Sequence, residues 1–280
     1  MAFFRALESV RPASVRLFAD PFAVRFIRRS LRNAVRLASV PPLGRLVDWR
    51  TDRRIPGART SAIARTRFID DALAESSREG KPQVVILGAG FDCRPYRLGF
   101  LTDCVIFEVD HPATLALKLA RLREVLPALP KNVTFVETDF DRQTLPAVLA
   151  SAGFRASLPA VFVWEGVTNY LTAEAVDAVL RCVAACAPGS RVIFTYVHSG
   201  VLDGSVPFFG AGRLLRDVAQ LGEPWRFGLR PELAPEFLRE RELRLECDLS
   251  APEYRGRYFG SAARRMRGYD FYHIALARVP

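Results

Sequence analysis

A glycine turn followed by acidic residues is the feature of this sequence that most clearly indicates chemistry. The stretch "VVILGAGFDCRPYRL", residues 84–98, is an apolar run that reaches Gly88, Ala89 and Gly90 and continues to Asp92. Glycines at the end of a buried strand let the backbone turn tightly and approach a bound nucleotide closely. The pattern therefore predicts a cofactor loop, and the residues around it must decide which cofactor the loop holds.

Acidic side chains also end the next apolar runs: Glu108 and Asp110, then Asp139, then Glu165. An open parallel sheet binds its ligands beyond the carboxyl ends of its strands. Glu108 or Asp110 stands at the usual distance after the glycines for an acid that accepts hydrogen bonds from a ribose. Asp139, with Phe140 beside it, could contact an adenine. Each acid alone could instead be a helix cap or a solvated charge, but four together favour a shared site.

The charges around the glycine turn favour S-adenosylmethionine (SAM) over a dinucleotide. A dinucleotide fingerprint has a third glycine where this chain has Cys93, and its pyrophosphate would approach Asp92. SAM carries a positive sulfonium and no phosphate. An NAD-type oxidoreductase on a similar sheet is the alternative that the residues leave open.

Apolar runs that alternate with helical patterns must position these residues. They predict one α/β domain of the Rossmann-like type, with a mostly parallel seven-stranded sheet and helices on both faces. The segment 270–279 is expected as the final edge strand. The predicted organisation is a helical cap over residues 1–80, a cofactor-binding core over 81–198, a lid over 199–240 and C-terminal strands over 241–280.

Composition narrows the class of protein. The five cysteines are odd in number and the three histidines form no metal-ligand spacing, so we expect no disulfide framework, no metal and a reducing, cytoplasmic setting. Residues 1–59 hold thirteen arginines against four acids, almost all of the net charge of +10. A solvated surface is the simpler interpretation of these arginines. The alternative is a non-catalytic protein that binds polyanions or a membrane surface. We expect no nucleic-acid partner and no membrane insertion.

Several motifs together resemble one family. They are "ARTRFIDDAL", "QVVILGAGFDCRPYRL", "FEVDHP" with Lys118 downstream, "TDF" and "EGVTNYLT". In combination they are similar to the leucine carboxyl methyltransferase family of class I SAM-dependent methyltransferases, strongly from near the start of the chain to about Thr172 and more loosely to the end. The opening stretch "FRALESVRPASVRLFADPFA" resembles bacterial members of that family. The resemblance implies the class I methyltransferase fold and SAM as cofactor.

The resemblance also implies particular roles. The implied cofactor-binding residues are Arg65, Gly88, Ala89, Gly90, Asp110, Asp139, Phe140 and Glu165. Asp110, rather than Glu108, matches the acid that binds the ribose. Arg65 matches the partner of the cofactor's carboxylate, although Arg59 or Arg67 could take that role. Family members methylate carboxylates, including a protein C-terminal leucine, but features for a phosphatase peptide are not found here.

We therefore expect an O-methyltransferase that acts on a carboxylate or hydroxyl of a small metabolite. A carboxylate acceptor is already ionised at neutral pH and needs no general base. A hydroxyl acceptor needs one, and the candidates are Tyr196 and His198. The acceptor-binding candidates are Tyr170, Tyr196 and Arg94. Aromatic residues of the lid and the C-terminal segment are expected to line the pocket or to pack the lid.

Overall fold

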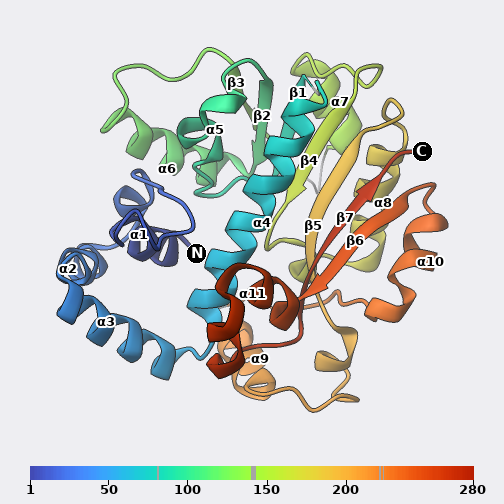
Figure 1. Cartoon of the computed structure of the whole chain (residues 1–280). Coiled ribbons are helices and arrows are strands. Elements are labelled where there is room, and N and C mark those ends of the chain that lie inside the picture. Colours follow the sequence, from blue (N-terminus) through green and yellow to red (C-terminus); the bar gives the residue numbers. More distant parts are fainter. Residues whose placement is uncertain (81, 140–142, 221, 223) are drawn as a thin grey trace.

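The sheet has the predicted seven strands, but their order differs from the prediction at one edge. The computed structural model describes residues 1–280 except residues 81, 140–142, 221 and 223. Within the described residues, seven strands form one sheet in the order β3-β2-β1-β4-β5-β7-β6 (Figure 1). Their bounds are β1 Gln83–Leu87, β2 Val105–Asp110, β3 Val133–Glu137, β4 Ala160–Trp164, β5 Arg191–Val197, β6 Arg244–Ser250 and β7 Tyr272–Arg278.

The first five strands are parallel and the last two are antiparallel to their neighbours. This arrangement confirms the predicted Rossmann-like architecture. The expectation that residues 270–279 form the edge strand was wrong, because β7 pairs with β5 on one side and with β6 on the other. The burial of β7 and β6 fits this strand order. The five central residues of β7 are buried, whereas every residue of β6 retains some exposure.

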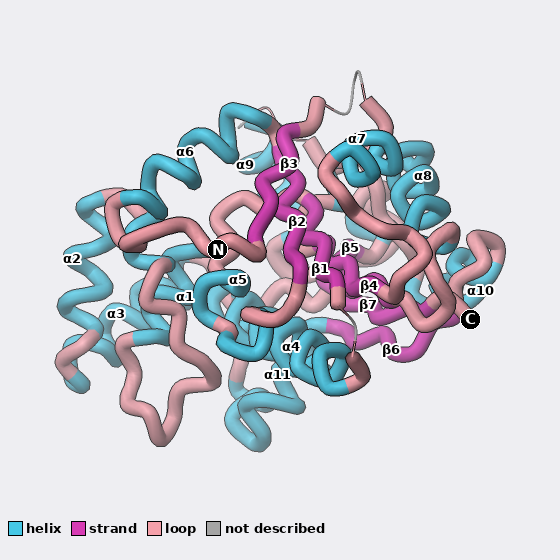
Figure 2. The backbone as a smooth tube through the Cα atoms, turned by 90° about the horizontal axis from the view of Figure 1, so that it is seen from above, coloured by secondary structure: helices cyan, strands magenta, loops and turns pink. Residues whose placement is uncertain are grey.

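Helices cover both faces of the sheet, as Figure 2 shows from above. The helices that flank it are α4 Ala58–Arg78, α5 Arg94–Arg97, α6 Pro112–Arg123, α7 Leu145–Ser151, α8 Ala173–Ala184, α10 Ala234–Arg239 and α11 Ala251–Phe259. Apolar residues of α4 and α11 form one core cluster with the strands. Apolar residues of α7, α8 and α10 form another cluster on the opposite face. Buried strands in such a sheet are apolar on both faces, which is why "VVIL" and "AVFVW" do not alternate.

The N-terminal region is helical, with α1 Ala2–Ser9, α2 Arg29–Ala38 and α3 Pro41–Arg54. Pro41 and Pro42 begin α3, because proline fits the first helical turn, where a backbone N–H has no partner in the helix. Helix α1 lies beside α4 near the carboxyl ends of the strands. Between β5 and β6 the chain forms α9 Ala211–Gln220 as well as α10. A lid role for residues 199–240 stays a prediction. None of the helices in the described part of the chain combines the length and hydrophobicity needed to cross a bilayer.

Candidate functional site

The turn after β1 has a backbone shape that requires glycine. Gly88 has a φ of +64°, which side-chain-bearing residues rarely adopt. A Cβ on Gly88 would also lie 2.5 Å from Cγ2 of Val167, in the loop after β4. The next backbone amide, Ala89 N, donates to Val109 O of β2 at 3.1 Å. These contacts fix the turn at the carboxyl edge of the sheet.

Asp110 ends β2 beside this turn. Its Oδ2 accepts a hydrogen bond from the Gly90 amide at 2.5 Å, and its Oδ1 accepts one from the His111 amide at 2.7 Å. Glu108, the other candidate, is fully buried and its Oε2 lies 2.8 Å from Nζ of Lys118. Burial raises the pKa of Glu108, and Lys118 opposes that effect. Glu108 therefore belongs to the interior, whereas the half-buried Asp110 lies at the turn.

Asp139 lies two residues after the end of β3, next to Asp110 across the sheet. The amide of Thr138 donates to the carbonyl oxygen of Asp110 at 3.0 Å, which holds the two strand ends together. Asp139 is half-buried, and its amide donates to Oε1 of Gln143 at 3.3 Å. Phe140, its predicted partner at the adenine, lies outside the described residues.

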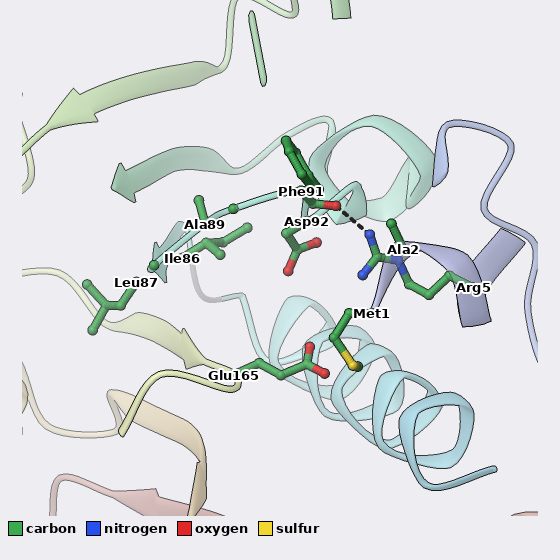
Figure 3. Close-up of a pocket in the computed structure, with 11 residues that line it drawn as sticks. Met1, Ala2, Arg5, Ile86, Leu87, Ala89, Phe91, Asp92 and Glu165 are labelled. Carbon is green, nitrogen blue, oxygen red and sulfur yellow. Dashed lines mark hydrogen bonds between the residues drawn. The ribbon is translucent and has the colours of Figure 1, made fainter. Parts of the chain in front are cut away.

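A cavity of about 200 Å³ lies against the glycine turn (Figure 3). Its lining residues are Met1, Ala2, Arg5, Ile86, Leu87, Gly88, Ala89, Gly90, Phe91, Asp92 and Glu165. The structure thus brings Gly88, Ala89, Gly90 and Glu165 together as predicted, and Asp110 borders them through the Gly90 amide. The volume is smaller than the roughly 300 Å³ at which ligand pockets usually begin, because Met1 and the start of α1 close one side.

Two carboxylates in this cavity are held in their ionised form. Burial disfavours the charge of Glu165, but the guanidinium groups of Arg94 and Arg65, each 2.9 Å away, lower its pKa. Burial also opposes the charge of Asp92, and Arg94 and Arg5 nevertheless lower its pKa to about 2. These two carboxylates would repel a diphosphate, whereas they would attract an ammonium or sulfonium group.

Arg5 of α1 is a site residue that the sequence does not reveal. Its Nε pairs with Asp20 at 2.8 Å, and its Nη2 donates to the carbonyl oxygen of Phe91 in the turn (Figure 3). These contacts hold α1 across the cavity. The two ends of the Arg5–Phe91 contact are 86 residues apart, so no local pattern could have predicted it.

A second cavity of about 180 Å³ adjoins the first, and Met1 lines both. Its other lining residues are Phe4, Ile55, Ala58, Ser61, Ala62, Arg65, Leu214, Tyr269 and Tyr272. The lining is mostly apolar, and Arg65 is the one charged side chain among the described residues that form it. The Arg65 guanidinium lies 5.9 Å from the centre of the Tyr272 ring, while its Nε is held by Glu165. Arg65 therefore lies between the two cavities.

The residues predicted to bind or activate the acceptor do not line either of these two cavities. Arg94 is 2% exposed and gives its three guanidinium nitrogens to Asp70, Asp92 and Glu165, so it positions acids and is not free to grip an acceptor. Tyr196 is 1% exposed and donates to Asp248 on the opposite face of the sheet.

The other two candidates do not line either cavity. Nδ1 of His198 accepts a hydrogen bond from the Gly200 amide at 2.9 Å, and its ring packs near Phe208. Tyr170 is an exposed residue of the short helix after β4. Tyr269 and Tyr272 are the tyrosines that line the second cavity. Burial raises the pKa of Tyr272, so its hydroxyl stays protonated at neutral pH.

Comparison with known proteins agrees with this geometry. The family model described as leucine carboxyl methyltransferase matches residues 1–184. A Streptomyces coelicolor protein named "Putative S-adenosyl-L-methionine-dependent methyltransferase" is 34% identical over 246 residues, which cover 86% of this chain and 84% of that protein. A Streptomyces avermitilis protein with the same description is 34% identical over 274 residues, with coverages of 95% and 93%.

Two solved structures share the fold. A DUF574 family protein from Streptomyces avermitilis superposes with a TM-score of 0.62 at 17% identity, over 98% of this chain and all of the other. A methyltransferase-like structure from Thermobifida fusca gives a TM-score of 0.57 at 19% identity, over 98% and 97%. These two likenesses concern the fold alone. The family match and the relatives lead to one conclusion. The chain belongs to the leucine carboxyl methyltransferase family and is a SAM-dependent methyltransferase.

Proposed function

We propose that the enzyme methylates an oxygen atom of a small, largely apolar acceptor in the second cavity, and that this oxygen belongs to a carboxylate. When bound, SAM supplies an electrophilic methyl group on its sulfonium. The observation that carries the proposal is the position of Arg65, a buried cation in an otherwise apolar cavity that adjoins the cavity of the glycine turn. A carboxylate paired with Arg65 would be held near the first cavity, and alignment of this kind is the main requirement for methyl transfer.

The remaining residues of the second cavity support a carboxylate over a hydroxyl. Its mostly apolar lining would strengthen the pairing of an acceptor carboxylate with a guanidinium, because few polar groups there screen the charges. A hydroxyl acceptor would need a base. Tyr272 is protonated at neutral pH and His198 lies outside this cavity. The Tyr272 hydroxyl has no hydrogen-bond partner among the residues that the structure describes, so it can donate to an acceptor oxygen.

For the cofactor we propose the set given by the turn and the strand ends: Gly88, Ala89, Gly90, Asp110, Asp139 and Glu165. Asp110 would accept hydrogen bonds from the ribose, and Glu165 would pair with the amine. Arg65 has two candidate roles, as partner of the cofactor's carboxylate or of the acceptor's carboxylate. Its position between the cavities supports both, and they predict different kinetics.

The test is turnover of a panel of small aromatic and aliphatic acids and phenols, with S-adenosylhomocysteine as the measured product. Methyl esters and ethers are then separated by their lability to mild base. We expect base-labile products from acids. Arg65→Gln should lower kcat/KM for acids by roughly thirtyfold, the effect of losing a charged hydrogen bond of about 2 kcal/mol.

Arg67→Gln is the matched control, because Arg67 lies on the same helix and pairs at the surface with Asp71. It should leave kcat/KM within twofold of the wild type. If Arg65→Gln weakens S-adenosylhomocysteine binding as much as it lowers kcat/KM, the cofactor role of Arg65 explains the effect. Turnover of phenols alone, with base-stable products, would refute the carboxylate.

A further inference from the structure

Helices α2 and α3 present an exposed surface that combines large apolar side chains with arginines. Helix α3 has no buried residue. The apolar side chains exposed on this pair and its ends are Leu37, Val40, Leu43, Leu46, Trp49 and Ile55. We call them, with the arginines of residues 28–54, the α2–α3 surface. It lies at the edge of the molecule opposite α8 and α10 (Figure 1).

The arginines of this surface have no carboxylate partners among the residues that the structure describes. Eight arginines lie in residues 28–54, namely Arg28, Arg29, Arg32, Arg36, Arg45, Arg50, Arg53 and Arg54. Across the described part of the chain, none of them forms an ion pair. The two acids of the same segment are already engaged, because Asp48 pairs with Arg11 and Arg59 and Asp52 pairs with Arg59. The surface therefore carries uncompensated positive charge.

Aromatic and cationic groups meet on α3. The Arg53 guanidinium lies 5.0 Å from the centre of the Trp49 ring, and a surface hollow there is lined by Trp49, Arg50, Arg53 and Arg54. Trp49 is 53% exposed. Tryptophan beside arginine is the combination found where a helix meets the headgroup layer of a membrane.

We propose that the α2–α3 surface docks onto an anionic membrane surface, with its arginines on lipid headgroups and its apolar side chains in the acyl boundary. A second copy of this chain would place arginines against arginines. Nucleic acid would satisfy the arginines but would leave the exposed Leu43, Leu46 and Val40 without an apolar partner. An anionic bilayer satisfies both groups.

Docking through this surface would bring the second cavity close to the membrane. Ile55, at the end of α3, is half-exposed and also lines the second cavity. An apolar acceptor dissolved in the membrane would thus meet the protein next to that cavity. The docking itself does not depend on the proposed function, since it is measured without acceptor and without turnover.

The experiment is co-sedimentation of the full chain with phosphatidylcholine vesicles that contain or lack phosphatidylglycerol. We expect binding only to the anionic vesicles, falling as salt screens the charges. The triple variant R50Q/R53Q/R54Q should lower the partition coefficient by roughly a hundredfold, because each arginine near an anionic surface contributes about a fivefold factor. The charge-matched control R181Q/R239Q/R244Q changes exposed arginines of α8, α10 and β6 and should bind as the wild type does.

A second pair of variants tests the apolar contribution. Trp49→Ser should lower partitioning about tenfold, whereas Leu233→Ser, at a residue that is also 53% exposed, should not change it. Tryptophan emission should shift to the blue on vesicle addition, and Trp49→Phe should remove the shift while keeping binding.

Three outcomes overturn the proposal. One is no binding to anionic vesicles at low salt. The second is a loss of vesicle binding in the control variants that equals the loss in the α3 variants. The third is binding to duplex DNA that matches vesicle binding and is insensitive to Trp49→Ser, which indicates a general polyanion surface. Dimerisation that Trp49→Ser abolishes, without vesicle binding, would assign the surface to a second copy instead.

Discussion

Replacing Asp110 by alanine isolates the contribution of the carboxylate at the end of β2. The side chain accepts hydrogen bonds from the Gly90 and His111 amides, and it is the strand-end acid that we assign to the ribose. A hydrogen bond to a charged group contributes about 1.5–3 kcal/mol. Loss of one such bond to the cofactor raises the Kd for S-adenosylhomocysteine by roughly 10- to 150-fold.

Calorimetric titration with S-adenosylhomocysteine measures this change, and thermal unfolding followed by circular dichroism checks that the variant is folded. Glu137→Ala is the matched control. Glu137 is the exposed β3 residue paired in register with Asp110, at the same edge of the sheet. It should leave the Kd unchanged. A folded Asp110→Ala protein with wild-type affinity, or an equal loss in Glu137→Ala, would show that the ribose acid has been assigned wrongly.

Further predictions concern pH, the turn and the ligand. Folding lowers the pKa of Asp92 from its ordinary value near 4 to about 2. Ionised Asp92 therefore stabilises the folded protein by about 2 kcal/mol above pH 4, and this contribution is lost as the pH falls toward 2. Denaturant unfolding should show that the free energy of unfolding of Asp92→Asn falls less between pH 5 and pH 2.5 than that of the wild type. Gly88→Ala should destabilise by about 2–4 kcal/mol through the positive φ and the contact with Val167, whereas Gly153→Ala, with a positive φ and open space, should cost about 1 kcal/mol. Decarboxylated SAM should bind at least tenfold more weakly than SAM in the same calorimeter; equal affinity would exclude an arginine at the carboxylate.

The strands and the parallel core could be predicted because their signals are local. An apolar run of five residues between turns reads as a buried strand wherever it later pairs. The position of β7 inside the sheet could not be read in this way. The strand order is decided by pairing between β5 and β7, whose residues are about eighty positions apart in the sequence. Nothing in the residues of β7 alone distinguishes an inner strand from an edge strand with an apolar face.

Two tyrosines show how strand register decides which side chains line the second cavity. Tyr196 and Tyr272 lie on neighbouring antiparallel strands, but Tyr272 pairs in register with Val197, one position further along β5. Successive side chains of a strand point to opposite faces. Tyr196 therefore belongs to the core beside α8, while Tyr272 lies on the face of α4, next to Arg65. The sequence indicates that Tyr196 lies near the end of β5, but the strand register places its side chain on the face opposite Tyr272.

The arginines change the charge balance that the acids alone would give the site. Counting carboxylates at the strand ends predicts a site with an excess of negative charge. In the structure, Arg94 and Arg65 pair with Glu165, Arg94 and Arg5 keep Asp92 ionised, and Arg5 itself lines the cavity. The result is a site of alternating charges with little net excess. Such a site discriminates by arrangement and not by total charge, because an amine, a sulfonium and a carboxylate on one ligand can each meet an opposite charge. A diphosphate offers charge of one sign only, so it could meet the arginines but would be repelled by Asp92 and Glu165.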